Sequence, residues 1–203
     1  MAKIKLTKNE LKRQKEDLKR FERYLPMLQL KKKQLQLEII KIHQSIREVS
    51  QKIDSLRQKV AVWAGVFAQK VPLREYCSLS KIKTSEGNVA GIDLPIFEGV
   101  EFKESEYSFL YTPLWVDKAL SAIKEMVSLK AEILIYHQQI DILKDELRVA
   151  NQRVNLFEKV KIPQAQDDIR VIQIHLGEVQ TAEVVRGKIA KAKIGRKKIL
   201  NKP

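Results

Sequence analysis

The sequence predicts a mainly α-helical protein, in the form of a long antiparallel two-helix coiled-coil hairpin with a small β-hairpin insert between the helices. Two long stretches repeat apolar residues every seven positions, in two rows offset by three or four residues, which is the pattern of a coiled coil. The stretch between them is richer in proline and glycine. Overall, 32% of the residues are charged and only 7 are glycine and 6 proline, a composition typical of long helices.

We expect residues 1–70 to form the first helix. One apolar row runs from Ile4 to Phe67 and is interrupted only by Lys32. The repeat predicts a helix of roughly 95 Å, and its apolar seam requires a partner helix. Pro26 lies away from the seam and leaves the phase unchanged, so we expect a bend in one continuous rod. The predicted seam residues are Leu18, Leu25, Leu35, Ile39, Ile42, Ile46, Val49, Ile53 and Leu56.

Residues 71–114 are expected to form a small β-containing insert. Prolines and glycines separate short runs such as Val89–Leu94 and Phe97–Phe102, a pattern that indicates one or two β-hairpins closed by turns. From Glu86 to Glu106 there are six acidic residues and one lysine. We interpret the insert as a contact knob, and a solvated connecting loop is the alternative.

The second helix is expected over residues 115–185. Its two apolar rows slip by one residue near Pro163 and then resume. Beyond the seam, residues 186–203 contain many lysines and arginines and no acidic residue, so we expect a basic tail that is flexible when free. The predicted seam residues of this helix are Ile133, Ile140, Leu143, Leu147 and Val154.

The two helices should pair in antiparallel fashion. Their lengths match, and a parallel pairing would force the connector to run back about 95 Å at about 3.3 Å per residue. A connector extended over that distance would have almost no residues left to form a folded insert. An antiparallel hairpin places both chain termini at one end and the insert toward the other.

The sequence contains no pattern of catalytic, cofactor-binding or metal-ligating residues, so we expect a protein that is not an enzyme by itself. The three histidines, His43, His137 and His175, are far apart in the sequence, and Cys77 is the only cysteine. The longest apolar run, Val60–Ala68, is nine residues, which is too short to span a membrane. No secretory signal is present, and we expect a cytoplasmic protein. The formal charge of +14 favours acidic partners.

Two motifs resemble the D subunit of the rotary V/A-type (vacuolar/archaeal-type) ATPases. The first begins at Asn151-Gln152 and is similar to the family signature RRVNALE…IP, with Arg153, Val154, Asn155, Glu158 and Pro163 at matching positions. The second, in the insert, is similar to the family segment N-I-x-G-V-x-x-P. It matches at Asn88, Gly91 and Pro95. The opening Leu6-Thr7-Lys8 and the run from Leu28 to Leu37 are also similar to the first helix of that family.

The resemblance implies a central rotor stalk that does not itself catalyse. Its paired terminal helices would stand in a ring of alternating catalytic A and B subunits. The other end would hold the small F subunit of the stalk and dock on the funnel-shaped subunit over the membrane ring, at the cytoplasmic face. Proton or sodium transport would then be coupled through rotation to ATP synthesis or hydrolysis. No small-molecule substrate, nucleic acid or cofactor is implied.

Two other functions fit a basic helical hairpin. The first is a coiled-coil stalk or chaperone of an export ATPase, which commonly lacks a folded acidic insert. The second is a nucleic-acid-binding coiled-coil protein, whose binding would weaken steeply with salt. A rotor subunit instead predicts co-purification with ATPase subunits.

Overall fold

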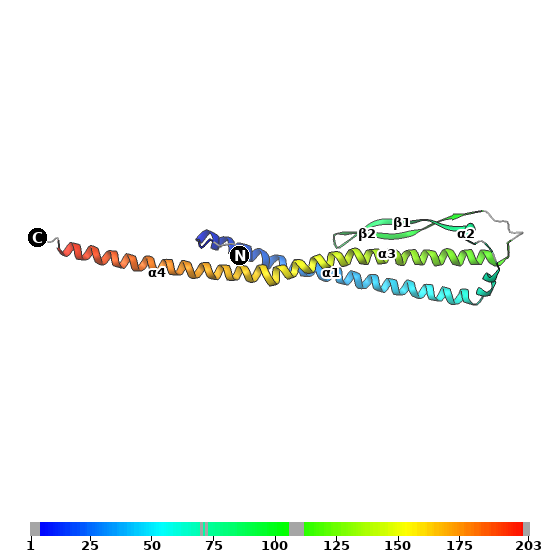
Figure 1. Cartoon of the computed structure of the whole chain (residues 1–203), viewed down its shortest axis with the longest axis horizontal. Coiled ribbons are helices and arrows are strands. Elements are labelled where there is room, and N and C mark those ends of the chain that lie inside the picture. Colours follow the sequence, from blue (N-terminus) through cyan, green and yellow to red (C-terminus); the bar gives the residue numbers. More distant parts are fainter. Residues whose placement is uncertain (1–4, 70, 72, 106–111, 201–203) are drawn as a thin grey trace. The chain divides into compact units, whose positions relative to one another are not determined.

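The computed structural model describes residues 5–69, 71, 73–105 and 112–200. Two long helical stretches flank one two-stranded antiparallel hairpin (Figure 1), which confirms the predicted fold class. Ile4, Glu106 and the last three residues of the predicted tail lie outside the described residues. The elements are α1 (Lys8–Ala61), a 3-10 turn (Ala64–Ala68), α2 (Leu73–Tyr76), β1 (Cys77–Val89), β2 (Ile92–Glu104), α3 (Trp115–Leu156), a π-helical turn (Phe157–Lys161, hereafter the π turn) and α4 (Ile162–Leu200).

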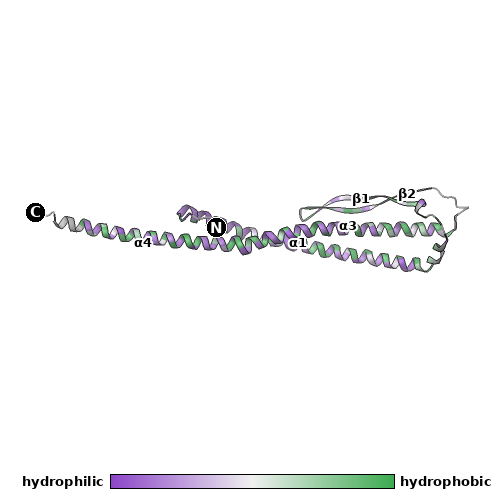
Figure 2. Cartoon of the chain, in the orientation of Figure 1, coloured by the Kyte–Doolittle hydropathy of each residue, from purple (hydrophilic) through white to green (hydrophobic). Residues whose placement is uncertain are grey.

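The chain divides into two compact units. The terminal unit comprises Met1–Leu30 and Asn151–Pro203, and the central unit comprises Lys31–Ala150. Helices α1 and α3 each contribute residues to both units. Figure 2 shows polar and apolar residues alternating along the helices, as expected where one stripe of each helix is buried.

Helix α1 begins with a side-chain cap. The backbone N–H of Glu10 donates to Oγ1 of Thr7 at 3.3 Å, which satisfies one of the free donors at a helix start. The helix runs without a break through Pro26 and ends at Ala61, before the last predicted seam residue, Phe67. The aromatic side chains beyond this end pack elsewhere. The ring of Phe67 lies 5.4 Å from that of Trp115, at the start of α3.

Strands β1 and β2 form one long hairpin with a two-residue turn. Val89 pairs with Ile92, and the two residues between them, Ala90 and Gly91, have φ angles of 55° and 77°. Two consecutive positive φ angles define the type I′ turn that suits the twist of a hairpin. The run Val89–Leu94, which the sequence pattern predicted as a strand, therefore contains the turn itself. Two register shifts, between Leu79 and Lys81 and between Lys83 and Thr84, add bulges.

In the central unit, α1 and α3 pack side by side in antiparallel fashion. Leu35 of α1 shares a buried cluster with Leu143 and Ala150 of α3. Further along α1, Ser45 contacts Tyr136, which comes earlier in α3. The hairpin packs on these helices, because Ile92 and Leu94 belong to the cluster of Leu35. A second cluster joins Cys77 of β1 to Val116 and Leu120 of α3.

In the terminal unit, the start of α1 pairs with α4 in the same antiparallel sense. The ring of Phe21 meets that of Phe157 edge-on at 5.4 Å, and Glu10, earlier in α1, lies near Asp168, later in α4. The described side chains from Gly177 to Ile194 are all exposed, and the helix continues to Leu200. The flexibility of the basic tail when free stays a prediction.

Candidate functional site

The predicted seam residues of the central unit are all buried or half-buried. Leu35 and Leu143 are 0% exposed, and burying one such side chain contributes about 1.5–3 kcal/mol. Fully buried residues on both helices therefore stabilise this pairing. Those that are buried are Leu35, Val49, Ile53, Leu56, Ile140 and Leu143, and those that are half-buried are Ile39, Ile42, Ile46, Ile133 and Leu147.

Polar side chains border this seam. The hydroxyl of Tyr136 donates a hydrogen bond to Oε1 of Glu132 at 2.9 Å. Burial raises the pKa of Tyr136 above its ordinary value, and the neighbouring Glu132 acts in the same direction, whereas the contact with Ser45 of α1 lowers it. The tyrosine thus stays neutral and connects the two helices through its hydroxyl.

In the terminal unit the predicted seam residues are less completely enclosed. Val154 is 5% exposed, whereas Leu18 and Leu25 are half-buried. Asp168 of α4 is also half-buried. Burial raises the pKa of its carboxyl, and the negative charges of Asp167 and Glu10 raise it further. The pairing of the terminal unit therefore combines apolar contacts with acidic groups that repel one another.

The signature residues of the insert gather around the hairpin turn. Nδ2 of Asn88 donates to Oδ1 of Asp93 at 2.7 Å, and the backbone N–H of Gly91 donates to Oδ1 of Asn88 at 3.1 Å. The amide thereby closes the turn that the positive φ of Gly91 permits. Beyond the turn, the carbonyl oxygen of Pro95 accepts a hydrogen bond from Nε2 of Gln139 on α3. This part of the signature therefore holds the hairpin turn and its attachment to α3.

The signature residues at the end of α3 lie mostly at the surface. Arg153, Asn155, Glu158 and Pro163 are exposed, and only Val154 is buried. Their side chains therefore contribute little to the packing of the terminal unit. The two signature groups belong to different units of the chain.

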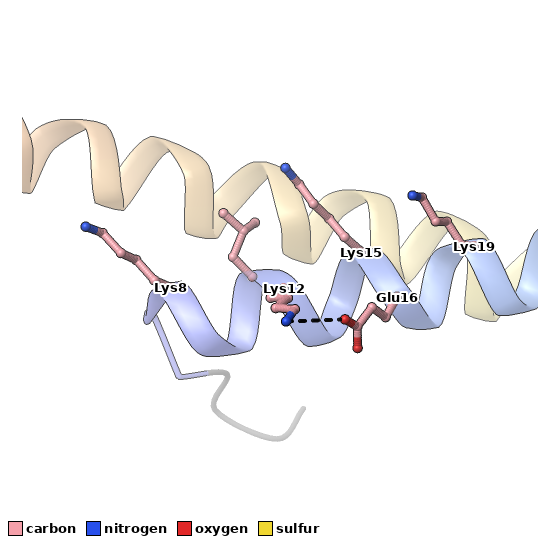
Figure 3. A pocket seen from close by; sticks show the side chains of 6 residues that line it. Lys8, Lys12, Lys15, Glu16 and Lys19 are labelled. Carbon is pink, nitrogen blue, oxygen red and sulfur yellow. Dashed lines mark ion pairs between the residues drawn. The ribbon is translucent and has the colours of Figure 1, made fainter.

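A basic face runs along the start of α1. Lys8, Lys12, Lys15 and Lys19 border a shallow groove of about 380 Å³ together with Leu11 (Figure 3). Glu16 offers the only carboxylate in this groove, and its Oε1 lies 4.0 Å from Nζ of Lys12. Four lysines against one acid give the face a positive potential that suits an acidic surface.

Within the described residues, no group of three or more His, Cys, Asp or Glu side chains is placed to hold a metal ion. His43 and His137 are exposed and His175 is half-buried. Burial raises the pKa of the Cys77 thiol, which disfavours the reactive thiolate. In the same part of the chain, no helical stretch combines the length and hydropathy that crossing a bilayer requires.

Two features of the helices, the burial of Gln139 and the π turn, were not predicted from the sequence pattern. Gln139 is only 7% exposed although it lies outside the predicted rows, and no local pattern marks it because a distant strand covers it. The π turn does leave a signal, since it coincides with the one-residue slip of the apolar rows near Pro163. The slip alone did not specify a π-helical geometry.

Comparison with known proteins gives a consistent result. The family model of the ATP synthase D subunit matches residues 10–192. A V-type ATP synthase D subunit of Borreliella burgdorferi is 45% identical over 185 residues, covering 91% of this chain and 92% of the relative. A protein of the same name from Chlamydia pneumoniae is 34% identical over 131 residues, or 62% of each chain. Because the signature residues lie in its helices and its hairpin and the match extends over most of its length, the chain belongs to the family of ATP synthase D subunits.

Proposed function

We propose that this chain is the central rotor shaft of a V-type ATP synthase or ATPase. It transmits torque between an ion-translocating membrane ring and a catalytic ring of A and B subunits, and so couples proton or sodium transport to ATP synthesis or hydrolysis. The observation that carries the proposal is the pairing of two long helices within each unit. The names of the relatives support the assignment to such a complex.

The packing suits a shaft that resists twist. Protein interiors are packed as densely as organic crystals and deform little, and the seam of the central unit contains side chains such as Leu35 and Leu143 that are completely buried. When one end of such a helical pair is turned, the interlocking side chains oblige the other helix to follow. The chain itself performs no chemical step in this proposal, since ATP is made or hydrolysed in the ring.

The outer surface suits rotation within a ring. Its ion pairs join exposed side chains, such as Arg57 with Asp54 at 3.6 Å and Arg148 with Asp145 at 3.3 Å. Exposed pairs of this kind contribute only about 0–1 kcal/mol each. Contacts with a surrounding ring that are as weak as these can be exchanged at each step without a high barrier.

The partners follow from this role. The basic termini, including the lysines of α1, sit in the bore of the A/B ring. The small F subunit of the stalk and the funnel-shaped subunit over the membrane ring bind toward the other end, and the complex stands at the cytoplasmic face of the membrane. A pull-down of the tagged chain from its native host tests these partners. Recovery of the A, B and F subunits supports the proposal, and their absence contradicts it.

A truncation tests the basic tail directly. Removing residues 186–203 deletes a segment whose described side chains are all exposed, so the rest of the fold should persist. We expect a lower ion-coupled ATPase rate in the assembled complex, because the tail no longer engages the bore. An unchanged rate together with unchanged assembly would contradict the placement of the tail.

A further inference from the structure

The π turn is the one break in the hydrogen-bonding pattern between α3 and α4. The backbone N–H of Ile162 donates to the carbonyl of Phe157, a residue one position farther back than in an α-helix. Pro163, the next residue, has no N–H to donate. The helix at this point therefore contains one residue more than a regular turn and one donor fewer.

This extra residue sets which face of α4 meets α1. Beyond the π turn the buried residues are Ala165, Ile169 and Ile172, which are 3%, 9% and 0% exposed. Each lies one position later than the rows of α3 would place it. One residue corresponds to a rotation of about 100° around the helix axis. Without the extra residue, Gln164 and Asp168 would occupy the seam.

Beside the contact of Phe21 with Phe157, the π turn borders a hollow that is lined mostly by polar side chains. A hollow of about 180 Å³ lies between the two helices of the terminal unit, and it is lined by Gln14, Asp17, Phe21, Lys161, Gln164, Ala165 and Asp168. Gln14 occupies a seam position in a row whose members from Phe21 onward are all apolar. Ala165, which is in the seam, therefore borders the same hollow as Gln164 and Asp168, which would form the alternative seam if the extra residue were absent.

We propose that the π turn and this hollow form a compliant joint, at which α4 can turn around its own axis against α1 within the terminal unit. The extra residue can move along the helix by exchanging one hydrogen bond for another, and each residue that it passes then rotates toward the alternative seam. Lys161, Gln164 and Asp168 can enter that seam because they already line a polar hollow. This inference rests on the proposed function in one respect only: the force that turns the joint would be the torque on the shaft.

Hydrogen exchange on the purified full-length chain tests the joint without reference to any partner. Amides open locally where packing is poor. We expect the amides of residues 157–168 to exchange at least about tenfold faster than those of the α3 seam around Ile140 and Leu143. Equal protection in the two segments would overturn the proposal.

Two substitutions and a control sharpen the test. Gln14→Leu fills the hollow with an apolar side chain, and Pro163→Ala restores a backbone donor. Each should slow exchange in residues 157–168 several-fold. The control, Gln29→Leu, adds the same side chain at an exposed position of α1 and should leave the exchange unchanged. If both test variants exchange as the native chain does, the hollow and the proline do not govern the opening, and the joint is refuted.

Failure of the joint can be distinguished from failure of the proposed function. In an assembled rotary complex, Gln14→Leu should narrow the angular fluctuations of a probe attached to the shaft, and an unchanged distribution would count against the joint. A chain that does not assemble with A and B subunits would contradict the rotor assignment. The exchange rates of the isolated chain would still decide whether the joint exists.

Discussion

A buried side-chain amide is one of the contacts that attach the hairpin to α3. Gln139 is 7% exposed, and its Nε2 donates to the carbonyl of Pro95. Gln139→Ala removes the donor of this hydrogen bond to the half-buried Pro95, so we expect the free energy of unfolding to fall by about 0.5–1.5 kcal/mol. Urea denaturation measures the difference. Gln138→Ala, at the exposed neighbouring position, is the control, and equal losses in both variants would show that the hydrogen bond contributes nothing.

The hairpin turn depends on the backbone freedom of Gly91. Its φ is 77°, and a Cβ added there would meet no atom within 4 Å. Gly91→Ala therefore costs only the backbone strain of a left-handed residue, about 1–2 kcal/mol. Gly99→Ala is the control, because Gly99 is also unobstructed and has no positive φ. Thermal unfolding should show a lower Tm for the first variant alone, and no difference between them would contradict the turn geometry.

At the level of residues, the sequence is most informative where burial follows a local period. The heptad predicts that Leu35 and Leu143 are buried, and the structure places both at 0% exposure. It does not predict a second buried stripe on α3, formed by Ala131, Ile135 and Gln139. The contact from Gln139 to Pro95 shows why, since the packing of a strand on a helix joins segments that are distant in the sequence.

In the central unit, Leu35 of α1 packs in one buried cluster with residues of both α3 and the hairpin. Leu35→Ala leaves a cavity among these three elements, and we expect a loss of about 2–5 kcal/mol in the free energy of unfolding. Leu37 lies on the same helix but is 58% exposed, so Leu37→Ala should change stability by no more than about 0.5 kcal/mol. Chemical denaturation of the two variants compares them directly. Similar losses would mean that the seam is not what stabilises the unit.

The elements themselves were predictable to different degrees. Long helices follow from a period sustained over many turns, and the one-residue slip near Pro163 coincides with the π turn. The ends of the elements were harder to predict from the sequence. Phe67 continues the apolar row, yet α1 ends at Ala61 and the ring of Phe67 packs against that of Trp115. In the insert, Ala90 lacks the turn preference of glycine or asparagine, so the pattern alone did not separate turn from strand.

At the scale of the whole molecule, the net charge of +14 bears on how the chain would enter an A/B ring in its proposed function. Charge complementarity chiefly raises the rate of association and makes it sensitive to salt. Lys8, Lys12, Lys15 and Lys19 concentrate positive charge on one face of α1. If the bore of the ring presents acidic groups, this face should steer the shaft during assembly while contributing little to the folded state.

Replacing these four lysines by glutamine tests that role. We expect unchanged helix content by circular dichroism, and about tenfold slower association with an isolated A/B ring at low salt, because the attraction that steers the encounter is removed. The difference should shrink as salt is added and screens the native face. The control replaces four exposed lysines of the central unit, Lys33, Lys41, Lys52 and Lys59, which carries the same change in net charge. A uniform slowing in both variants would show that total charge, and not the face of α1, directs assembly.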